Sequence, residues 1–113
     1  MNRRFHVAAI VLAVAVASLA SRSGEAQGLS PAAQRGQVFV KTNCAQCHAI
    51  GRVGDSPLKI APPLRTLHRN YPVESLEEAF AEGISTGHPT MPEFRLDPGQ
   101  IHDVISYLKS LER

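Results

Sequence analysis

The sequence contains little cysteine and few aromatic residues. Its 113 residues include two cysteines, no tryptophan, two tyrosines and four phenylalanines. Small domains bury a smaller share of their surface than large ones, and many need a disulfide, a metal or another staple to be stable. So few large side chains build only a marginal core. The composition therefore predicts that something besides side chains fills the interior.

The sequence also lacks a dense cluster of basic residues. From residue 27 onward, three lysines and six arginines balance three aspartates and six glutamates. The bases lie mostly within residues 35–69 and the acids within residues 74–93. This separation predicts an electrically polarised molecule. Because a nucleic-acid site needs basic residues concentrated on one face, the lack of a dense basic cluster predicts that the protein does not bind nucleic acid.

The first 26 residues have the organisation of a secretory signal peptide. Arg3 and Arg4 precede a run of 14 mostly apolar residues at positions 7–20. This run is shorter than the roughly 17 to 25 apolar residues that span a bilayer, so a stable membrane anchor is disfavoured. Small residues permit cleavage after Ala26 or, alternatively, after Ala20. We predict that residues 1–26 are removed on export and that residues 27–113 form one domain.

The remaining sequence predicts helices and no strands, and hence an all-α domain. Apolar residues recur at helical spacing, whereas prolines and glycines interrupt the stretches between the helical segments. The predicted helices lie at residues 31–43, 64–71, 76–84 and 98–111. Three of them begin at a predicted cap: Ser30 before Pro31, Ser75 paired with Glu78, and Asp97 paired with Gln100.

The motif CAQCH at residues 44–48 offers three possibilities: a zinc site, a redox disulfide or a covalently attached haem. A structural zinc needs four ligands, and the remaining histidines lack the ordered spacing that would complete the set. A thioredoxin-like disulfide needs a βαβ context, which this sequence lacks. Haem attachment uses every residue of the motif, because two thiols add to the two vinyl groups and the histidine binds the iron. We therefore predict one haem c held by Cys44 and Cys47, with His48 as an axial ligand.

Met91 is the candidate for the second axial ligand. It is the only methionine after residue 1, and prolines at positions 89 and 92 stiffen its segment. A stiff segment suits a long, weak iron–sulfur bond, although a lone methionine can also simply fill a gap in a core. His88 is the rival ligand and would give an iron with two histidines and a lower reduction potential.

With these features the chain resembles the class I c-type cytochromes. The resemblance covers essentially all of residues 27–113: a helix ending in CAQCH, a proline-containing loop, a methionine loop and a C-terminal helix with an aromatic residue. It implies a small all-α cytochrome c fold in which three to five helices wrap around one covalently bound haem. It also implies five residue roles: Cys44 and Cys47 carry the thioethers, His48 is the proximal ligand, Met91 is the distal ligand, and the carbonyl of Pro62 accepts the ring N–H of His48.

The resemblance further implies that the first and last helices cross at a glycine and an aromatic residue. Gly36 and Tyr107 occupy these positions, and a glycine without a Cβ lets two helix backbones approach closely. The aromatic residue usual in the family, four residues before the first cysteine, is replaced by Val40, with Phe39 before it. The side chains expected to line the haem pocket are Leu64, Leu67, Phe80, Ile84, Phe94, Ile105 and Leu108.

The predicted function is that of a periplasmic one-electron carrier, not an enzyme, because an iron with six ligands has no place for a substrate. Two alternatives stay open: an electron-accepting cytochrome subunit of a periplasmic dehydrogenase, and a haem ligand sensor or peroxidase-like protein from whose iron Met91 dissociates. No apolar surface stripe demands a partner helix, so a monomer is expected.

The expected partners are redox proteins. The basic stretch at residues 35–69 includes the haem motif, so a partner is expected to dock an acidic surface at the haem edge. The basic residues expected to rim that edge are Lys41, Arg52, Lys59 or Arg65.

Overall fold

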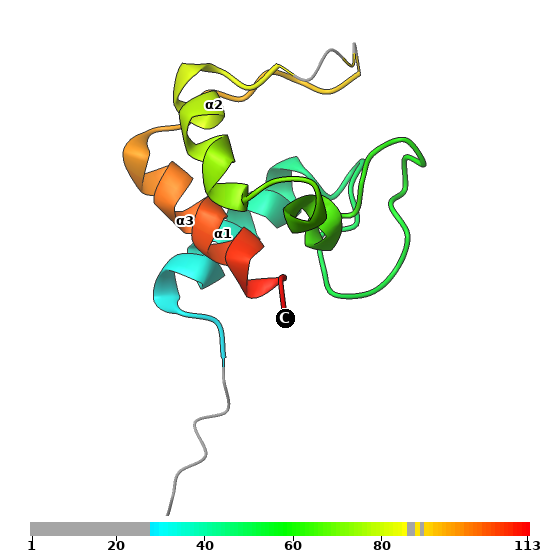
Figure 1. Cartoon of the computed structure of the whole chain (residues 1–113), viewed down its shortest axis with the longest axis horizontal. Coiled ribbons are helices and arrows are strands. Elements are labelled where there is room, and N and C mark those ends of the chain that lie inside the picture. The colour runs from blue at the N-terminus through cyan, green and yellow to red at the C-terminus, as the bar shows by residue number, and fades with distance from the viewer. Residues whose placement is uncertain (1–27, 86–87, 89) are drawn as a thin grey trace, which may run out of the picture.

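The structure is a computed structural model that describes residues 28–85, 88 and 90–113. The predicted signal peptide lies outside these residues. The described part contains three α-helices, α1 (Pro31–Asn43), α2 (Leu76–Glu82) and α3 (Pro98–Ser110), and two short 3-10 helices, η1 (Leu64–Arg69) and η2 (Val73–Ser75) (Figure 1). No strand ladder forms among the described residues, where one isolated bridge joins Ile84 and Phe94. The predicted all-α class is confirmed.

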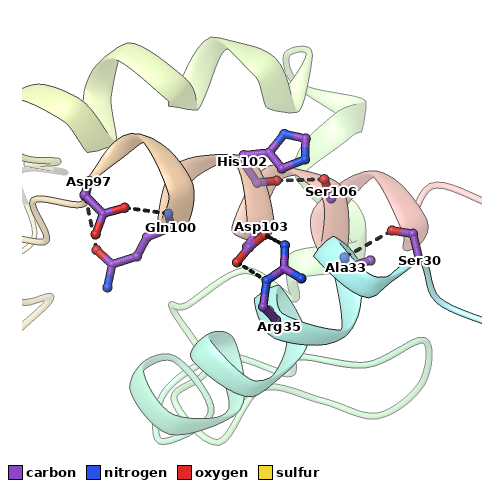
Figure 2. Close-up of polar contacts among 8 residues, drawn as sticks. All are labelled: Ser30, Ala33, Arg35, Asp97, Gln100, His102, Asp103 and Ser106. Atoms are coloured by element: carbon purple, nitrogen blue, oxygen red, sulfur yellow. Dashed lines mark hydrogen bonds and ion pairs between the residues drawn. The ribbon is translucent and has the colours of Figure 1, made fainter.

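The first and last helices begin at the predicted caps. The Ser30 hydroxyl accepts a hydrogen bond of 3.1 Å from the backbone N–H of Ala33, with Pro31 at the first helical position. The Asp97 carboxylate accepts a bond of 2.9 Å from the backbone N–H of Gln100, whose side-chain oxygen accepts one of 3.1 Å from the N–H of Asp97 (Figure 2). Each cap pairs an N–H that the first helical turn leaves unsatisfied.

The prediction of a capping box at the start of α2 is wrong. Ser75 has helical dihedral angles (φ −63°, ψ −15°), and its side chain makes no capping hydrogen bond. The reason is that the chain enters α2 already coiled, through η2, whereas a capping side chain needs an extended backbone at its own residue. The predicted helix at 64–71 forms as the 3-10 helix η1 and is shorter, because Pro72 restricts the residue before it to extended conformations.

The α2 helix also ends earlier than predicted. Gly83 adopts φ +105° and stops the helix, so Ile84 lies outside it. Instead, the backbone N–H of Ile84 donates to the carbonyl of Phe94 at 2.9 Å. The segment that follows α2 is therefore paired with the segment that leads into α3.

The α1 and α3 helices cross and pack directly against each other (Figure 1). Gly36 lies at the crossing, where a Cβ would stand 2.0 Å from the backbone oxygen of Asp103 and 2.9 Å from the Cβ of Tyr107. Val40, one turn further along α1, is 1% exposed. The predicted close approach of Gly36 to the helix that carries Tyr107 is confirmed.

An ion pair borders this crossing. The guanidinium of Arg35 donates to both carboxylate oxygens of Asp103, at 2.8 Å and 2.7 Å (Figure 2). The hydrogen bond lowers the pKa of Asp103 and raises that of Arg35. The contact joins α1 to α3 beside the crossing.

Tyr107 connects α3 to the segment that follows the CAQCH motif. Its ring is 2% exposed, and its hydroxyl donates a 2.6 Å hydrogen bond to the carbonyl of Ile50. On the other side of the same segment, the guanidinium of Arg52 donates to the carbonyls of Ser110 and Arg113, at 2.7 Å and 3.0 Å. Tyr107 and the end of α3 thus hold residues 50–52, which directly follow the CAQCH motif.

Among the described residues, no helix is long and apolar enough to cross a membrane.

Candidate haem site

A cavity of about 340 Å³ lies next to the end of α1. Side chains of α1, η1, α2 and α3 contribute to its lining, together with the segments around residues 58–62 and 90–94. The volume falls within the roughly 300 to 1,000 Å³ of typical ligand pockets. The lining is predominantly apolar, and it brings together residues that stand far apart in the sequence: Cys44, Cys47, His48 and Met91.

The end of α1 places the motif at this cavity. After Asn43 the chain makes one further turn, in which the N–H groups of Cys47 and His48 donate to the carbonyl of Cys44, at 3.2 Å and 2.9 Å. Both cysteines and the histidine consequently line the same cavity. The loop that follows the motif folds back against it, because the N–H of Leu58 donates to the carbonyl of Cys47 at 3.1 Å.

Among the described residues, the two thiols lie in a set of side chains that does not complete a zinc site. Cys44 and Cys47 are both free cysteines. Burial raises the pKa of Cys44 to about 11, with the neighbouring Cys47 as a smaller cause. Among the described residues, no three His, Cys, Asp or Glu side chains come close enough together to hold a metal ion.

His48 is oriented by the backbone of Pro62. Its Nδ1 lies 2.7 Å from the Pro62 carbonyl oxygen. A carbonyl can only accept, so Nδ1 carries the proton in this contact and Nε2 keeps its lone pair. That tautomer, held by a backbone carbonyl, is the arrangement found in histidines that bind a metal through Nε2. The same residue pair follows from the resemblance to class I cytochromes.

Both candidates for the second axial ligand lie at the cavity. Met91 is half-buried and His88 is exposed, and both contribute to the lining. The backbone N–H of Met91 donates to the carbonyl of His88 at 3.1 Å, so the backbones of the two residues lie close together. The greater burial of Met91 favours the thioether.

The structure corrects one expected pocket residue. Six of the seven line the cavity, but Ile105 does not. Val104 lines it instead, four residues before Leu108 on the same face of α3, whereas Ile105 is rotated by about 100° from Val104, away from the Asp103 and Tyr107 side that meets α1. Helical spacing from Leu108 fits both Ile105 and Val104, so it could not separate the two.

Sequence reasoning also missed several lining residues. Tyr71 follows η1 and contributes to the lining, where burial raises the pKa of its phenol. Ile60 contributes as well, although it is 61% exposed. Tyr71 follows Leu64 and Leu67 at helical spacing, and this signal could have identified it, whereas Ile60 lies in irregular chain, where hydrophobic spacing gives no indication of direction.

The four basic residues expected at the haem edge differ in exposure and in the contacts they make. None of the four lines the cavity. Lys59 stands between two residues that do and is exposed, as is Lys41 in the last turn of α1. Arg52, by contrast, pairs with the carbonyls at the end of α3, and Arg65 is half-buried. Lys59 and Lys41 therefore remain the candidates for basic residues at the haem edge.

The site fits a covalently attached haem. It combines an apolar cavity, two adjacent free thiols, an imidazole in the tautomer suited to a metal and a thioether on one lining. These features define the class of small helical proteins that carry haem c.

Comparison with known proteins gives the family. The family model for cytochrome c matches residues 33–112. A cytochrome c-553-like protein of Synechocystis sp. (strain ATCC 27184 / PCC 6803 / Kazusa) is 30% identical over 108 residues, which cover 93% of this chain and 96% of that protein. Cytochrome c6 of Picosynechococcus sp. (strain ATCC 27264 / PCC 7002 / PR-6) is 37% identical over 106 residues, 87% of this chain and 90% of that protein. No solved structure gives a significant match.

The chain therefore belongs to the cytochrome c family and is a small class I c-type cytochrome. It carries one covalent haem c, for which Cys44 and Cys47 have the required spacing. Its function is that of a small haem electron carrier and not of an enzyme.

Proposed function

We propose that this cytochrome is an exported one-electron carrier whose haem iron is bound by His48 and Met91. The observation that carries the proposal is the lining of one cavity by both residues, with Nδ1 of His48 held 2.7 Å from the Pro62 carbonyl. Cys44 and Cys47 provide the thioether bonds. The alternative, a sensor or peroxidase-like protein, requires an iron position that Met91 leaves open.

The residues around the cavity tune the reaction that the haem supplies, which is reversible one-electron transfer. The contact with Pro62 raises the basicity of the His48 ring. The soft thioether of Met91 favours ferrous iron and raises the reduction potential. The apolar lining disfavours the additional positive charge of ferric iron and so acts in the same direction.

Carbon monoxide separates the carrier from the sensor. An iron that already has six protein ligands has no free position, so the ferrous holoprotein is expected to resist carbon monoxide near neutral pH. The Met91→Ala variant, which frees one position, is the matched control and is expected to bind it readily. Equal binding by both proteins would refute the proposed ligation and favour the sensor.

Export is part of the proposal. The run at positions 7–20 and the small residues before position 27 support removal of residues 1–26, with cleavage after Ala20 as the alternative. The mass of the protein purified from the periplasm of a bacterial host should correspond to residues 27–113 plus one haem. A mass that includes residues 1–26 would contradict the cleavage, and a mass without haem would contradict the attachment.

We further propose that the partner docks at the surface around Ile60 and presents acidic residues there. Ile60 is a cavity residue with 61% exposure, and the exposed Lys59 stands next to it. Ferricyanide, an anionic oxidant, serves as the probe. Its rate of oxidation of the ferrous protein should fall with salt, and Lys59→Gln should weaken that dependence more than Arg69→Gln. The second variant removes the same charge from an exposed residue whose neighbours in sequence do not line the cavity. Equal effects of the two variants would refute the docking site.

A further inference from the structure

The segment that carries Met91 is closed at its base by hydrogen bonds. The N–H of Ile84 donates to the carbonyl of Phe94, and the N–H of Leu96 donates to the carbonyl of Phe80, each at 2.9 Å. The outgoing chain after α2 and the returning chain before α3 therefore run side by side (Figure 1). Met91 lies three residues before the returning half of this closure.

Arg95 adds a side-chain bond to the same closure. Its Nη2 donates to the carbonyl of Glu82 at 2.8 Å. Glu82 is the last residue of α2, where helical carbonyls have no partner within the helix. Gly83 turns the chain away at φ +105° directly afterwards. The guanidinium thus joins the returning chain to the end of α2 at the point where the outgoing chain leaves the helix.

The position of Met91 depends on this closure as well as on its own surroundings. Met91 is only half-buried, and its backbone N–H donates within its own segment, to His88. Two hydrogen bonds join the returning chain to α2 at the base of the segment, from the N–H of Leu96 to Phe80 and from the guanidinium of Arg95 to Glu82. Local opening of a protein occurs where few such contacts hold a segment.

We propose that Arg95 is a positioning residue that holds Met91 at the haem iron by fastening the returning chain to the end of α2. This inference rests on the proposed ligation by Met91. Arg95 does not line the cavity; it acts through the path of the backbone between residues 91 and 95.

Imidazole gives a direct measure of this role, because it binds ferric iron only where Met91 has dissociated. Its apparent affinity is proportional to the fraction of molecules in that open state. A charged hydrogen bond at an exposed residue such as Arg95 changes the ratio of open to closed states by about five-fold when it is removed. The apparent dissociation constant for imidazole should fall by the same factor.

The experiment titrates the ferric holoprotein with imidazole in the wild type and three variants. Arg95→Ala is expected to bind imidazole about five-fold more tightly, and Arg95→Lys, which keeps a cationic donor, to lie between this variant and the wild type. Arg69→Ala removes an exposed arginine outside the cavity and is expected to match the wild type. Unfolding by guanidinium chloride, followed by far-ultraviolet circular dichroism, is measured on the same proteins.

The two proposals fail in distinguishable ways. If Arg95→Ala loses global stability but binds imidazole like the wild type, Arg95 has only a structural role and the inference is overturned. If Arg69→Ala changes the affinity as much as Arg95→Ala, the effect is one of net charge and the inference is equally overturned. If the wild-type ferric protein lacks the charge-transfer band of an iron–methionine bond, the proposed ligation itself fails and the inference falls with it.

Discussion

Replacing Gly36 by alanine is expected to destabilise the protein by forcing α1 and α3 apart. The new Cβ would stand 2.0 Å from the backbone oxygen of Asp103, whereas real Cβ atoms essentially never approach another heavy atom closer than 3.0 Å. The distance between the backbones of α1 and α3 at this point must therefore increase by at least the difference, 1.0 Å. Because the obstacle is backbone inside a helix, no side-chain rotation relieves it.

The size of the effect follows from two opposing contributions. Overpacking of a close contact costs about 1 to 3 kcal/mol and more where backbone must move, and this site belongs at the upper end. The higher helix propensity of alanine stabilises the folded state by about 1 kcal/mol relative to glycine. The free energy of unfolding should therefore fall by about 2 kcal/mol, equivalent to a melting temperature lower by about 8 to 16 °C in a domain of this size.

Guanidinium chloride unfolding of the ferric holoprotein measures this difference. Gly51→Ala is the matched control, because its Cβ would meet nothing within 4 Å and its φ is not positive. That variant should be unchanged or more stable by up to about 1 kcal/mol. If Gly36→Ala were as stable as the wild type or more so, helix propensity would outweigh the contact and the account of the crossing would be wrong.

Three further predictions concern the contacts around α3. Tyr107→Phe should lower the free energy of unfolding by about 1 to 3 kcal/mol, because the carbonyl of Ile50 loses its 2.6 Å hydrogen bond; chemical denaturation would show no change if that carbonyl were hydrated instead. Asp103→Asn removes the ion pair with Arg35, which lowers the pKa of Asp103 in the folded state. The stability that the pair contributes is present above the ordinary aspartate pKa of about 3.9 and is lost as the pH falls through the lowered value. The stability gap between wild type and Asp103→Asn should accordingly close in acid, and a gap independent of pH would contradict this assignment. Asp97→Ala should cost about 1 kcal/mol through loss of the α3 cap, and an unchanged midpoint of denaturation would show that the first turn of α3 finds other partners.

The helices at the two ends of the domain were predictable because their caps are local. Ser30 and Asp97 each bond to a backbone N–H three residues away, so sequence spacing alone identifies them. The same pattern at Ser75 failed, because the chain arrives there from the 3-10 helix η2 and not from extended backbone. Capping depends on the conformation before the cap as well as on the cap itself.

The residues of the site were predictable to the extent that short motifs specify them. The spacing of Cys44, Cys47 and His48 indicated haem attachment, and Met91 was the sole thioether after residue 1. What the sequence could not give were contacts between distant residues. The bond from Arg52 to the end of α3 and the bond from Arg95 to α2 depend on how the loops return, and no local pattern encodes them.

The central claim is that Met91 completes the coordination of the iron opposite His48. The most direct test is the near-infrared spectrum of the ferric holoprotein, compared with Met91→Ala and His88→Ala. The account predicts the weak charge-transfer band of a methionine bound to ferric iron in the wild type and in His88→Ala, and its loss in Met91→Ala. Absence of the band from a wild-type protein that carries covalent haem, or its persistence in Met91→Ala, would contradict the account.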